Sequence, residues 1–249
     1  MIRRQEGTTI ARRGFSGSAL KWIALLSMLI DHFAAVVYLG SVRAGVQIFS
    51  RELYYTLRLV GRLAFPIFAF LLAEGILHTR SVKKYLLRLL LFGLLSEIPF
   101  DLAFRRAWMD WSYQNVFFTL FLGLLAVWLF ERITCGAPDA CGAPRVMLGL
   151  LCIGTAAAAA KLCRTDYGAW GVLVIVSMAL FREKEWLRDL LAGCFLLGSS
   201  PLEVTGLTDF LLFHFYNGQR GRQAKYIFYI FYPAHLLLLV LIRRAAYGI

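Results

Sequence analysis

The stretch that decides the fold is Leu20–Leu39, LKWIALLSMLIDHFAAVVYL, a run of mainly apolar residues. About 20 such residues in a helix span the hydrocarbon core of a bilayer. Beyond Lys21, its acidic and basic side chains are Asp31 and His32, and a charge at that depth costs about 2.5 kcal/mol or more. Residues of this kind usually face a protein interior or a wet cavity. The stretch therefore predicts a membrane helix and a place for chemistry.

The composition of the whole chain indicates a membrane protein. Of its 249 residues, 59% are hydrophobic and 17% are charged, against about 25% charged residues in soluble domains. The formal charge is +12, but Lys and Arg gather in short connections between apolar segments, which is typical of membrane topology signals. We therefore expect the lipid bilayer as the solvent and no nucleic acid as a partner.

The cysteine pattern predicts neither a disulfide framework nor a metal centre. The chain has five Cys, an odd number, and Cys152 and Cys194 lie inside apolar stretches where thiols act as small packing groups. Cys135 and Cys141 flank a short loop, but no second pair of Cys or His at zinc-ligand spacing accompanies them. No metal is expected.

The apolar runs predict an all-α fold, a polytopic integral membrane helical bundle of about nine transmembrane helices around a polar cavity. The predicted spans are residues 20–39, 53–77, 84–104, 114–131, 145–161, 167–181, 186–199, 204–216 and 227–242. The short spans on either side of Ser199-Ser200-Pro201 also fit one broken or re-entrant pair. Residues 1–19 are expected to form a disordered cytoplasmic segment, and residues 20–249 one transmembrane domain.

The positive charges predict the orientation of the bundle. When successive connections are assigned to alternating sides, seventeen Lys and Arg fall on the side of the N-terminus and eight on the other side. Cytoplasmic loops carry the excess of Lys and Arg. The N-terminus is therefore predicted to be cytoplasmic and the C-terminus to lie outside.

Ionisable, amide and phenol side chains also lie within or beside the other predicted spans. They are Arg58, Arg62, Glu74, Glu97, Asp101, Gln114, Asn115, Asp166, Tyr167 and His235. At a rise of about 1.5 Å per residue, His32 lies about 15 Å from the cytoplasmic end of its helix, and Arg62 lies at a similar depth. Bundled together, these groups would line a cavity that opens outward from the membrane centre.

Asp31 and His32 project about 100° apart on a helix, so they need different partners. We expect Arg62 to neutralise Asp31, which leaves His32 facing the cavity as a base. The alternative is structural: His32 bonds a neighbouring carbonyl, and Asp31 and Arg62 form a clamp. His235 follows Pro233, which opens the local backbone, so its ring is expected near carbonyls freed by the missing amide.

Ordered motifs along the chain carry a resemblance to a known family. They are Met28-Leu29-Ile30-Asp31-His32, Gly61-Arg62-Leu63-Ala64-Phe65-Pro66, Glu74-Gly75, Ser96-Glu97-Ile98-Pro99-Phe100-Asp101, Gln114-Asn115-Val116-Phe117-Phe118-Thr119-Leu120 and Asp166-Tyr167-Gly168. Together they resemble the TraX family over nearly the whole chain after residue 20. The resemblance implies a protein of the bacterial cytoplasmic (inner) membrane, associated with N-terminal acetylation of pilin in conjugation. It also implies kinship with multi-spanning acyltransferases that use a cytoplasmic acyl-CoA donor and a membrane-embedded histidine.

On that resemblance, the expected reaction moves an acetyl group from acetyl-CoA to an amine or hydroxyl of a small molecule, a polysaccharide or a pilin-like peptide. His32 is expected to act as base or to carry the acetyl group, and Asp31 to orient it. Arg62 or Asn115 would stabilise the oxyanion. The residues expected at the donor are Glu74 and, for the CoA phosphates, Arg80, Lys83, Lys84 and Arg88. Those expected to bind the acceptor are Glu97, Asp101, Gln114, Asp166, Tyr167 and His235.

Two other functions fit the same residues. A proton-coupled transporter also needs His and carboxylates at mid-depth and a broken helix near its substrate, although the chain shows no pair of matching halves. A non-enzymatic assembly protein would use the polar residues to hold its helices together. Release of free CoA by the purified protein separates the enzyme from both alternatives.

Overall fold

The computed structural model describes residues 14–134, 142–222 and 225–248. These residues divide into two compact units. Unit 1 comprises Ala69–Gly93 and Ser112–Pro201, and unit 2 comprises Gly14–Phe68, Leu94–Trp111 and Leu202–Ile249. The predicted disorder of residues 1–13 and the loop between Cys135 and Cys141 lie outside the described residues.

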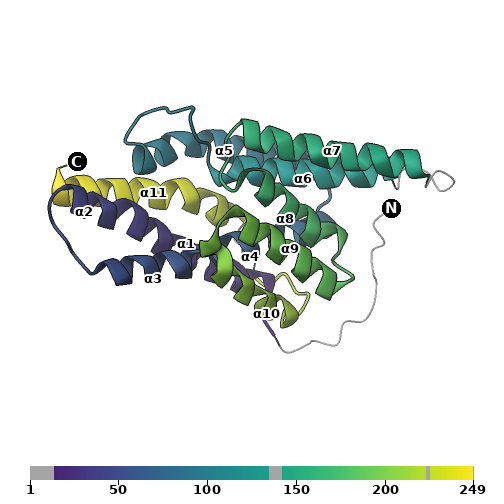
Figure 1. Ribbon diagram of the computed structural model, residues 1–249, viewed down its shortest axis with the longest axis horizontal. Helices are drawn as coiled ribbons and strands as arrows, with labels where there is room; N and C mark the ends of the chain where they lie inside the picture. Colours follow the sequence, from purple (N-terminus) through teal and green to yellow (C-terminus); the bar gives the residue numbers. More distant parts are fainter. Residues whose placement is uncertain (1–13, 135–141, 223–224, 249) are drawn as a thin grey trace. The chain divides into compact units, whose positions relative to one another are not determined.

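The described residues form helices joined by turns, with two isolated backbone bridges (Figure 1). The first half holds α1 (Gly17–Phe33), the π-helical turn η1 (Ala34–Tyr38), α2 (Leu39–Arg43), α3 (Arg51–Gly61), α4 (Ala64–His78), α5 (Val82–Phe104) and α6 (Val116–Thr134). The second half holds α7 (Ala143–Leu162), α8 (Gly168–Leu180), α9 (Glu185–Ser199), the 3₁₀ helix η2 (Pro201–Thr208), α10 (Asp209–His214) and α11 (Lys225–Tyr247). The all-α prediction is confirmed for this part of the chain.

Within the described ranges, five helical stretches are long and apolar enough to cross a membrane. They are Gly17–Arg43, Arg51–His78, Val116–Thr134, Ala143–Leu162 and Tyr226–Tyr247. Leu95, Leu151 and Leu241 are each more than half exposed, which suits contact with lipid rather than water. The chain is therefore a helical membrane protein with several spanning helices. Nine full crossings and a cytoplasmic N-terminus stay predictions.

Most predicted bounds differ from the structure by a few residues, and two of the differences have a clear physical reason. α1 begins at Gly17, before the predicted start at Leu20, because Ser16 caps it: Ser16 Oγ accepts a hydrogen bond from Ala19 N at 3.3 Å. The predicted span 204–216 was wrong as a single helix. Ser200 has extended backbone, and η2 and the short α10 follow it. The break predicted at Ser199-Ser200-Pro201 is thus present.

In unit 1, α6 packs against α7 and α8, and α8 packs against α9. Figure 1 shows α6 and α7 running side by side. Small residues set the spacing: a Cβ added at Gly123 of α6 would lie 2.5 Å from Ile175 Cδ1 of α8. Leu124 and Ile175 are fully buried between these helices. Close packing through small residues is typical of membrane helices, which gain little from hydrophobic contact in lipid.

In unit 2, α1 packs against α3 and α11. The side chains of Leu20 and Ala24 on α1 and Leu236 on α11 are fully buried. The π-helical turn η1 directly follows the segment that holds Asp31 and His32, and π-helical turns inside α-helices frequently occur at functional sites. This packing places Asp31 on the α3 side of α1 and His32 on the α11 side.

Candidate functional site

α1 and α3 approach closely where Asp31 faces Gly61. A Cβ at residue 61 would lie 2.2 Å from Asp31 Cβ, so glycine is required for this approach. One turn away on α1, Ser27 Oγ donates a hydrogen bond to Val60 O at 2.6 Å. The contact brings the carboxylate of Asp31 to the face of α3 that carries Arg58 and Arg62, which are spaced to share one side of the helix.

Asp31 is the centre of a buried ionic cluster. Arg58 Nη1 donates to Asp31 Oδ2 at 2.6 Å, and Arg62 Nη2 donates to Asp31 Oδ1 at 2.9 Å. Arg62 Nη1 donates in addition to Glu203 Oε1 at 3.1 Å. The side chains of Asp31 and Glu203 are 8% and 1% exposed. Removing one partner of such a cluster is costly because it leaves an uncompensated buried charge.

The predicted contact between Asp31 and Arg62 is therefore confirmed, whereas the contacts of Arg58 and Glu203 with this cluster were not predicted. Arg58 lies one helical turn before Arg62, and that spacing was a signal for a second counter-charge. Glu203 follows the helix break at Pro201, far away in sequence, and no local pattern connects it with Arg62. With both carboxylates as partners, Arg62 holds helices together, and its predicted role at the oxyanion stays a prediction.

His32 pairs with His235 rather than with the acidic cluster. His32 Nδ1 lies 2.7 Å from His235 Nε2, and the two rings are nearly parallel, with an interplanar angle of 4°. The rings of Phe104 and Tyr232 flank His32 at centroid distances of 5.3 and 6.0 Å. His235 is buried, while His32 is partly exposed. The two histidines thus form one hydrogen-bonded unit in an aromatic surround.

The hydrogen-bond pattern determines which nitrogen carries each proton. His235 Nδ1 lies 2.7 Å from the carbonyl oxygen of Phe231, and a carbonyl only accepts, so His235 Nδ1 is the donor. The Nε2 of a neutral His235 is then an acceptor, and His32 Nδ1 must donate to it. In the neutral form, His32 Nε2 therefore keeps its lone pair. This atom makes no hydrogen bond to the part of the chain that the structure describes.

For His235, the structure corrects part of the prediction. Its ring reaches the carbonyl of Phe231, as expected for a histidine near Pro233. Because proline has no N–H, Pro233 leaves the carbonyl of Tyr229, one turn earlier, without its helical hydrogen bond. The ring of His235 therefore bonds a different carbonyl from the one that Pro233 frees. The structure places His235 against His32, and its predicted role at the acceptor stays a prediction.

Asp101 and Glu97, predicted to bind the acceptor, lie on the α5 segment of unit 2. Asp101 is fully buried, and its Oδ2 accepts a hydrogen bond from the amide of Asp110 at 2.7 Å. At the end of α5, Arg243 donates to the carbonyls of Leu102 and Ala103 at 2.9 and 2.7 Å. Arg243 is one of the eight Lys and Arg that the charge count assigns to the outer side, and in the structure it is buried in α11.

In unit 1, the structure brings together four of the predicted residues. Gln114 N donates to Arg164 O at 3.0 Å, and Asp166 N donates to Gln114 O at 2.9 Å. The hydroxyl of Tyr113 donates to Asp166 Oδ1 at 2.8 Å. Tyr167 follows with a positive φ of 63° and leads into α8. These residues join the starts of α6 and α8.

Asn115, the fourth of these residues, is fully buried at the start of α6. Its Nδ2 donates to the carbonyl of Gly93 at 2.9 Å, and its Oδ1 accepts from Phe117 N at 3.0 Å. The amide oxygen thus caps the start of α6, and the amide nitrogen holds α6 against α5. Its predicted part in stabilising an oxyanion stays a prediction.

The basic residues predicted for the CoA phosphates lie around the turn between α4 and α5. Arg80, Lys83 and Lys84 are exposed, and the guanidinium of Arg88 lies over the ring of Tyr85, 5.4 Å from its centroid. Glu74, also expected at the donor, could have paired with Lys83 or Lys84 across this turn, but it makes no ion pair with either among the described residues. The charges that act on Glu74 are those of Arg182 and Arg188.

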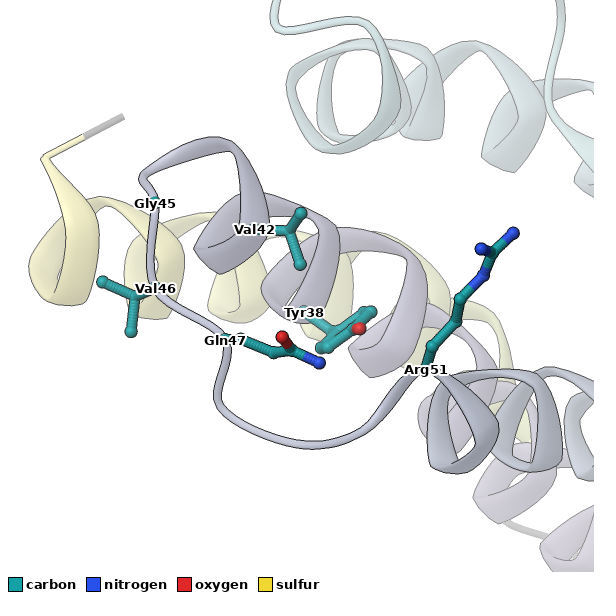
Figure 2. A pocket seen from close by; sticks show the side chains of 6 residues that line it. All are labelled: Tyr38, Val42, Gly45, Val46, Gln47 and Arg51. Carbon is teal, nitrogen blue, oxygen red and sulfur yellow. The ribbon is translucent and has the colours of Figure 1, made fainter.

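A pocket of about 350 Å³ lies where α2 turns into α3 (Figure 2). Its lining residues are Tyr38, Val42, Gly45, Val46, Gln47 and Arg51. The ring of Tyr38 stacks on Phe49, with 4.3 Å between the ring centroids. This lining includes no predicted site residue. The polar cavity expected around the spans stays a prediction.

Fold and site together define a helical integral membrane protein with a buried ionic cluster beside a histidine pair. The chain belongs to the TraX family: the family model described as TraX protein matches residues 16–243. The resemblance found in the motifs is thereby confirmed. A curated relative is the "Probable fimbrial assembly protein FimC, serogroup H1" of Dichelobacter nodosus. It is 32% identical over 257 residues, which cover 90% of this chain and 94% of the relative. No solved structure matches the chain.

Proposed function

We propose that this protein is a membrane acetyltransferase that moves an acetyl group from acetyl-CoA to an amine or hydroxyl acceptor. The observation that carries the proposal is the histidine pair, because its hydrogen bonds leave the lone pair of His32 Nε2 available. A partly exposed imidazole with a fixed tautomer is suited to general base catalysis. His235 is then a positioning residue, which fixes the proton on His32 Nδ1.

In the proposed reaction, His32 Nε2 takes a proton from the acceptor as the acceptor attacks the thioester carbonyl. The new bond joins the acceptor nitrogen or oxygen to the acetyl carbon, and the bond between that carbon and the CoA sulfur breaks. The proton passes from His32 to the departing thiolate, so free CoA leaves as a thiol. The cluster of Asp31, Arg58 and Arg62 holds α1 against α3 and thereby fixes the direction of His32.

The name of the relative supports a pilus-related acceptor. That protein is called a probable fimbrial assembly protein, so we propose the amino group of a pilin-like subunit as the acceptor in this chain. The same name also favours a second candidate, in which the protein assists fimbrial assembly without catalysis. We place the donor at the α4–α5 turn, where Arg80, Lys83 and Lys84 offer exposed cations to the CoA phosphates.

Release of free CoA tests the enzyme directly. The full chain is purified in detergent and incubated with acetyl-CoA and a peptide that carries the N-terminus of a pilin, and thiol release is followed with a colour reagent. We expect release that depends on the peptide and falls at least 100-fold in His32→Ala. His214→Ala is the matched control, because His214 is an exposed histidine of the same unit, and it should keep full release.

The outcomes separate the candidates. Equal release by His32→Ala and the wild type would overturn His32 as the base. Binding of the peptide without any CoA release would favour assembly without catalysis. Solute flux in liposomes that lack CoA would instead support a proton-coupled transporter.

A further inference from the structure

Asp209 is a buried acid without a counter-charge of its own. It opens α10 in unit 2, outside the five long apolar stretches. The residue is fully buried, and neither of its carboxyl oxygens has a hydrogen-bond partner in the described part of the chain. A carboxylate in such a place is strongly disfavoured, and the group takes up a proton instead.

The surroundings of Asp209 oppose a negative charge further. η2, the element directly before Asp209, is held against the end of α3, since Thr205 Oγ1 donates to Leu59 O at 2.7 Å. The charged group that acts on Asp209 is Glu203 of η2, a second carboxylate. Glu203 is already in an ion pair with Arg62 at 3.1 Å.

The charges of the whole cluster balance without Asp209. α3 contributes two guanidinium groups, those of Arg58 and Arg62. They are matched by two carboxylates, Asp31 of α1 and Glu203 of η2. An ionised Asp209 would add a third negative charge beside Glu203, at a fully buried position.

We propose that Asp209 is a proton-binding site, which keeps its proton at neutral pH and leaves the Arg58, Arg62, Asp31 and Glu203 cluster electrically balanced. Burial, together with the charge of Glu203, raises the pKa of Asp209 to about 9. At pH 7 about one molecule in 100 would carry the ionised form. The inference does not depend on acetyl transfer, because it concerns the folded chain alone.

Stability as a function of pH provides the first test. The ordinary pKa of this carboxyl is 3.8, so between about pH 4 and pH 9 the folded chain binds one proton more than the unfolded chain. The stabilisation that Asp209 supplies is fully present below pH 4 and is lost as the pH rises to about 9. Asp209→Asn removes the titration. The Tm of the variant minus that of the wild type should therefore rise steadily from pH 5 to pH 9 and level off above it.

The control is Glu52→Gln, which removes an exposed carboxyl of α3 in the same unit and should keep the pH dependence of the wild type. A constant offset in Tm between Asp209→Asn and the wild type at all pH values would overturn the proposal. The test depends on how the difference in Tm between variant and wild type changes with pH. A destabilisation by the asparagine side chain that is the same at every pH therefore does not affect it.

Infrared spectroscopy of the wild type in detergent supplies a second measurement that needs no variant to fold. A protonated carboxyl has a C=O stretch at higher frequency than a carboxylate. We expect such a band at pH 7, its loss with a midpoint near pH 9, and its absence in Asp209→Asn. Complete absence of a protonated carboxyl band from the wild type at pH 7 would equally overturn the proposal.

Discussion

Replacing Gly61 by alanine tests the close approach of α1 and α3 on which the ionic cluster depends. The added Cβ would lie 2.2 Å from Asp31 Cβ and 2.3 Å from Asp31 Oδ1, whereas non-bonded carbon atoms rest about 3.5 to 4.0 Å apart. The helices must therefore separate by about 1 Å or more. A shift of this size lengthens the contacts of Arg58 and Arg62 with Asp31, now 2.6 and 2.9 Å, beyond hydrogen-bond range.

The expected loss of stability follows from three contributions. Overpacking a well-packed site costs about 1–3 kcal/mol, and disruption of a buried ion pair costs up to about 3–5 kcal/mol when one charge is left without its partner. Alanine in a helix gains about 0.5–1 kcal/mol over glycine. Because the cluster is stretched rather than emptied, we expect Gly61→Ala to lose about 2–4 kcal/mol.

Gly154→Ala is the matched control for this prediction. Gly154 lies inside α7, and a Cβ there meets nothing within 4 Å, so this variant should gain up to about 1 kcal/mol from helix propensity alone. Both variants are measured by equilibrium unfolding in mixed detergent micelles. If Gly61→Ala proves as stable as Gly154→Ala, the close contact between Asp31 and α3 is refuted.

Three further substitutions test other parts of the structure. Arg243→Ala removes two charge-assisted hydrogen bonds to the end of α5 and should lower the unfolding free energy by about 2–4 kcal/mol. Its control is Arg244→Ala, at an exposed residue, which should change the unfolding free energy by less than about 0.5 kcal/mol. Thr119→Val removes a buried hydroxyl that donates to the carbonyl of Asp166 and accepts from the hydroxyl of Thr165. It should cost about 1–3 kcal/mol in the same assay, against little or no change for the exposed Thr155→Val. His235→Leu removes the nitrogen that accepts the hydrogen bond of His32 Nδ1. It should reduce CoA release at least tenfold while the KM for acetyl-CoA stays unchanged. Release at the wild-type rate would exclude His235 as a positioning residue.

The sequence predicted the helices better than their ends. Long apolar runs such as Leu20–Leu39 specify a spanning helix through composition alone, so the all-α membrane class followed directly. The segment 204–216 has a similar composition, yet it folds as η2 and α10. A short, irregular element is favoured there by Pro201 and by the buried acids Glu203 and Asp209. The mean hydropathy of the segment does not show the effect of these single residues.

The candidate site was predictable where depth and charge were enough. Asp31 and Arg62 were paired because their helices place them at similar depth. The contact of Arg58 was not predicted because one counter-charge already satisfied the carboxylate in that argument. Glu203 was not predicted at the site, and His235 was not paired with His32, because these contacts join residues more than a hundred positions apart. Only tertiary packing of η2 and α11 brings them to α3 and α1.

The most direct test of the central claim is transfer of a labelled acetyl group by the protein in liposomes. Radiolabelled acetyl-CoA is supplied with a pilin-derived peptide, and label on the peptide amine is counted for the wild type, His32→Gln and His214→Gln. The account predicts labelled peptide with the wild type and His214→Gln and almost none with His32→Gln. Equal labelling by His32→Gln would contradict the assignment of His32 Nε2 as the base.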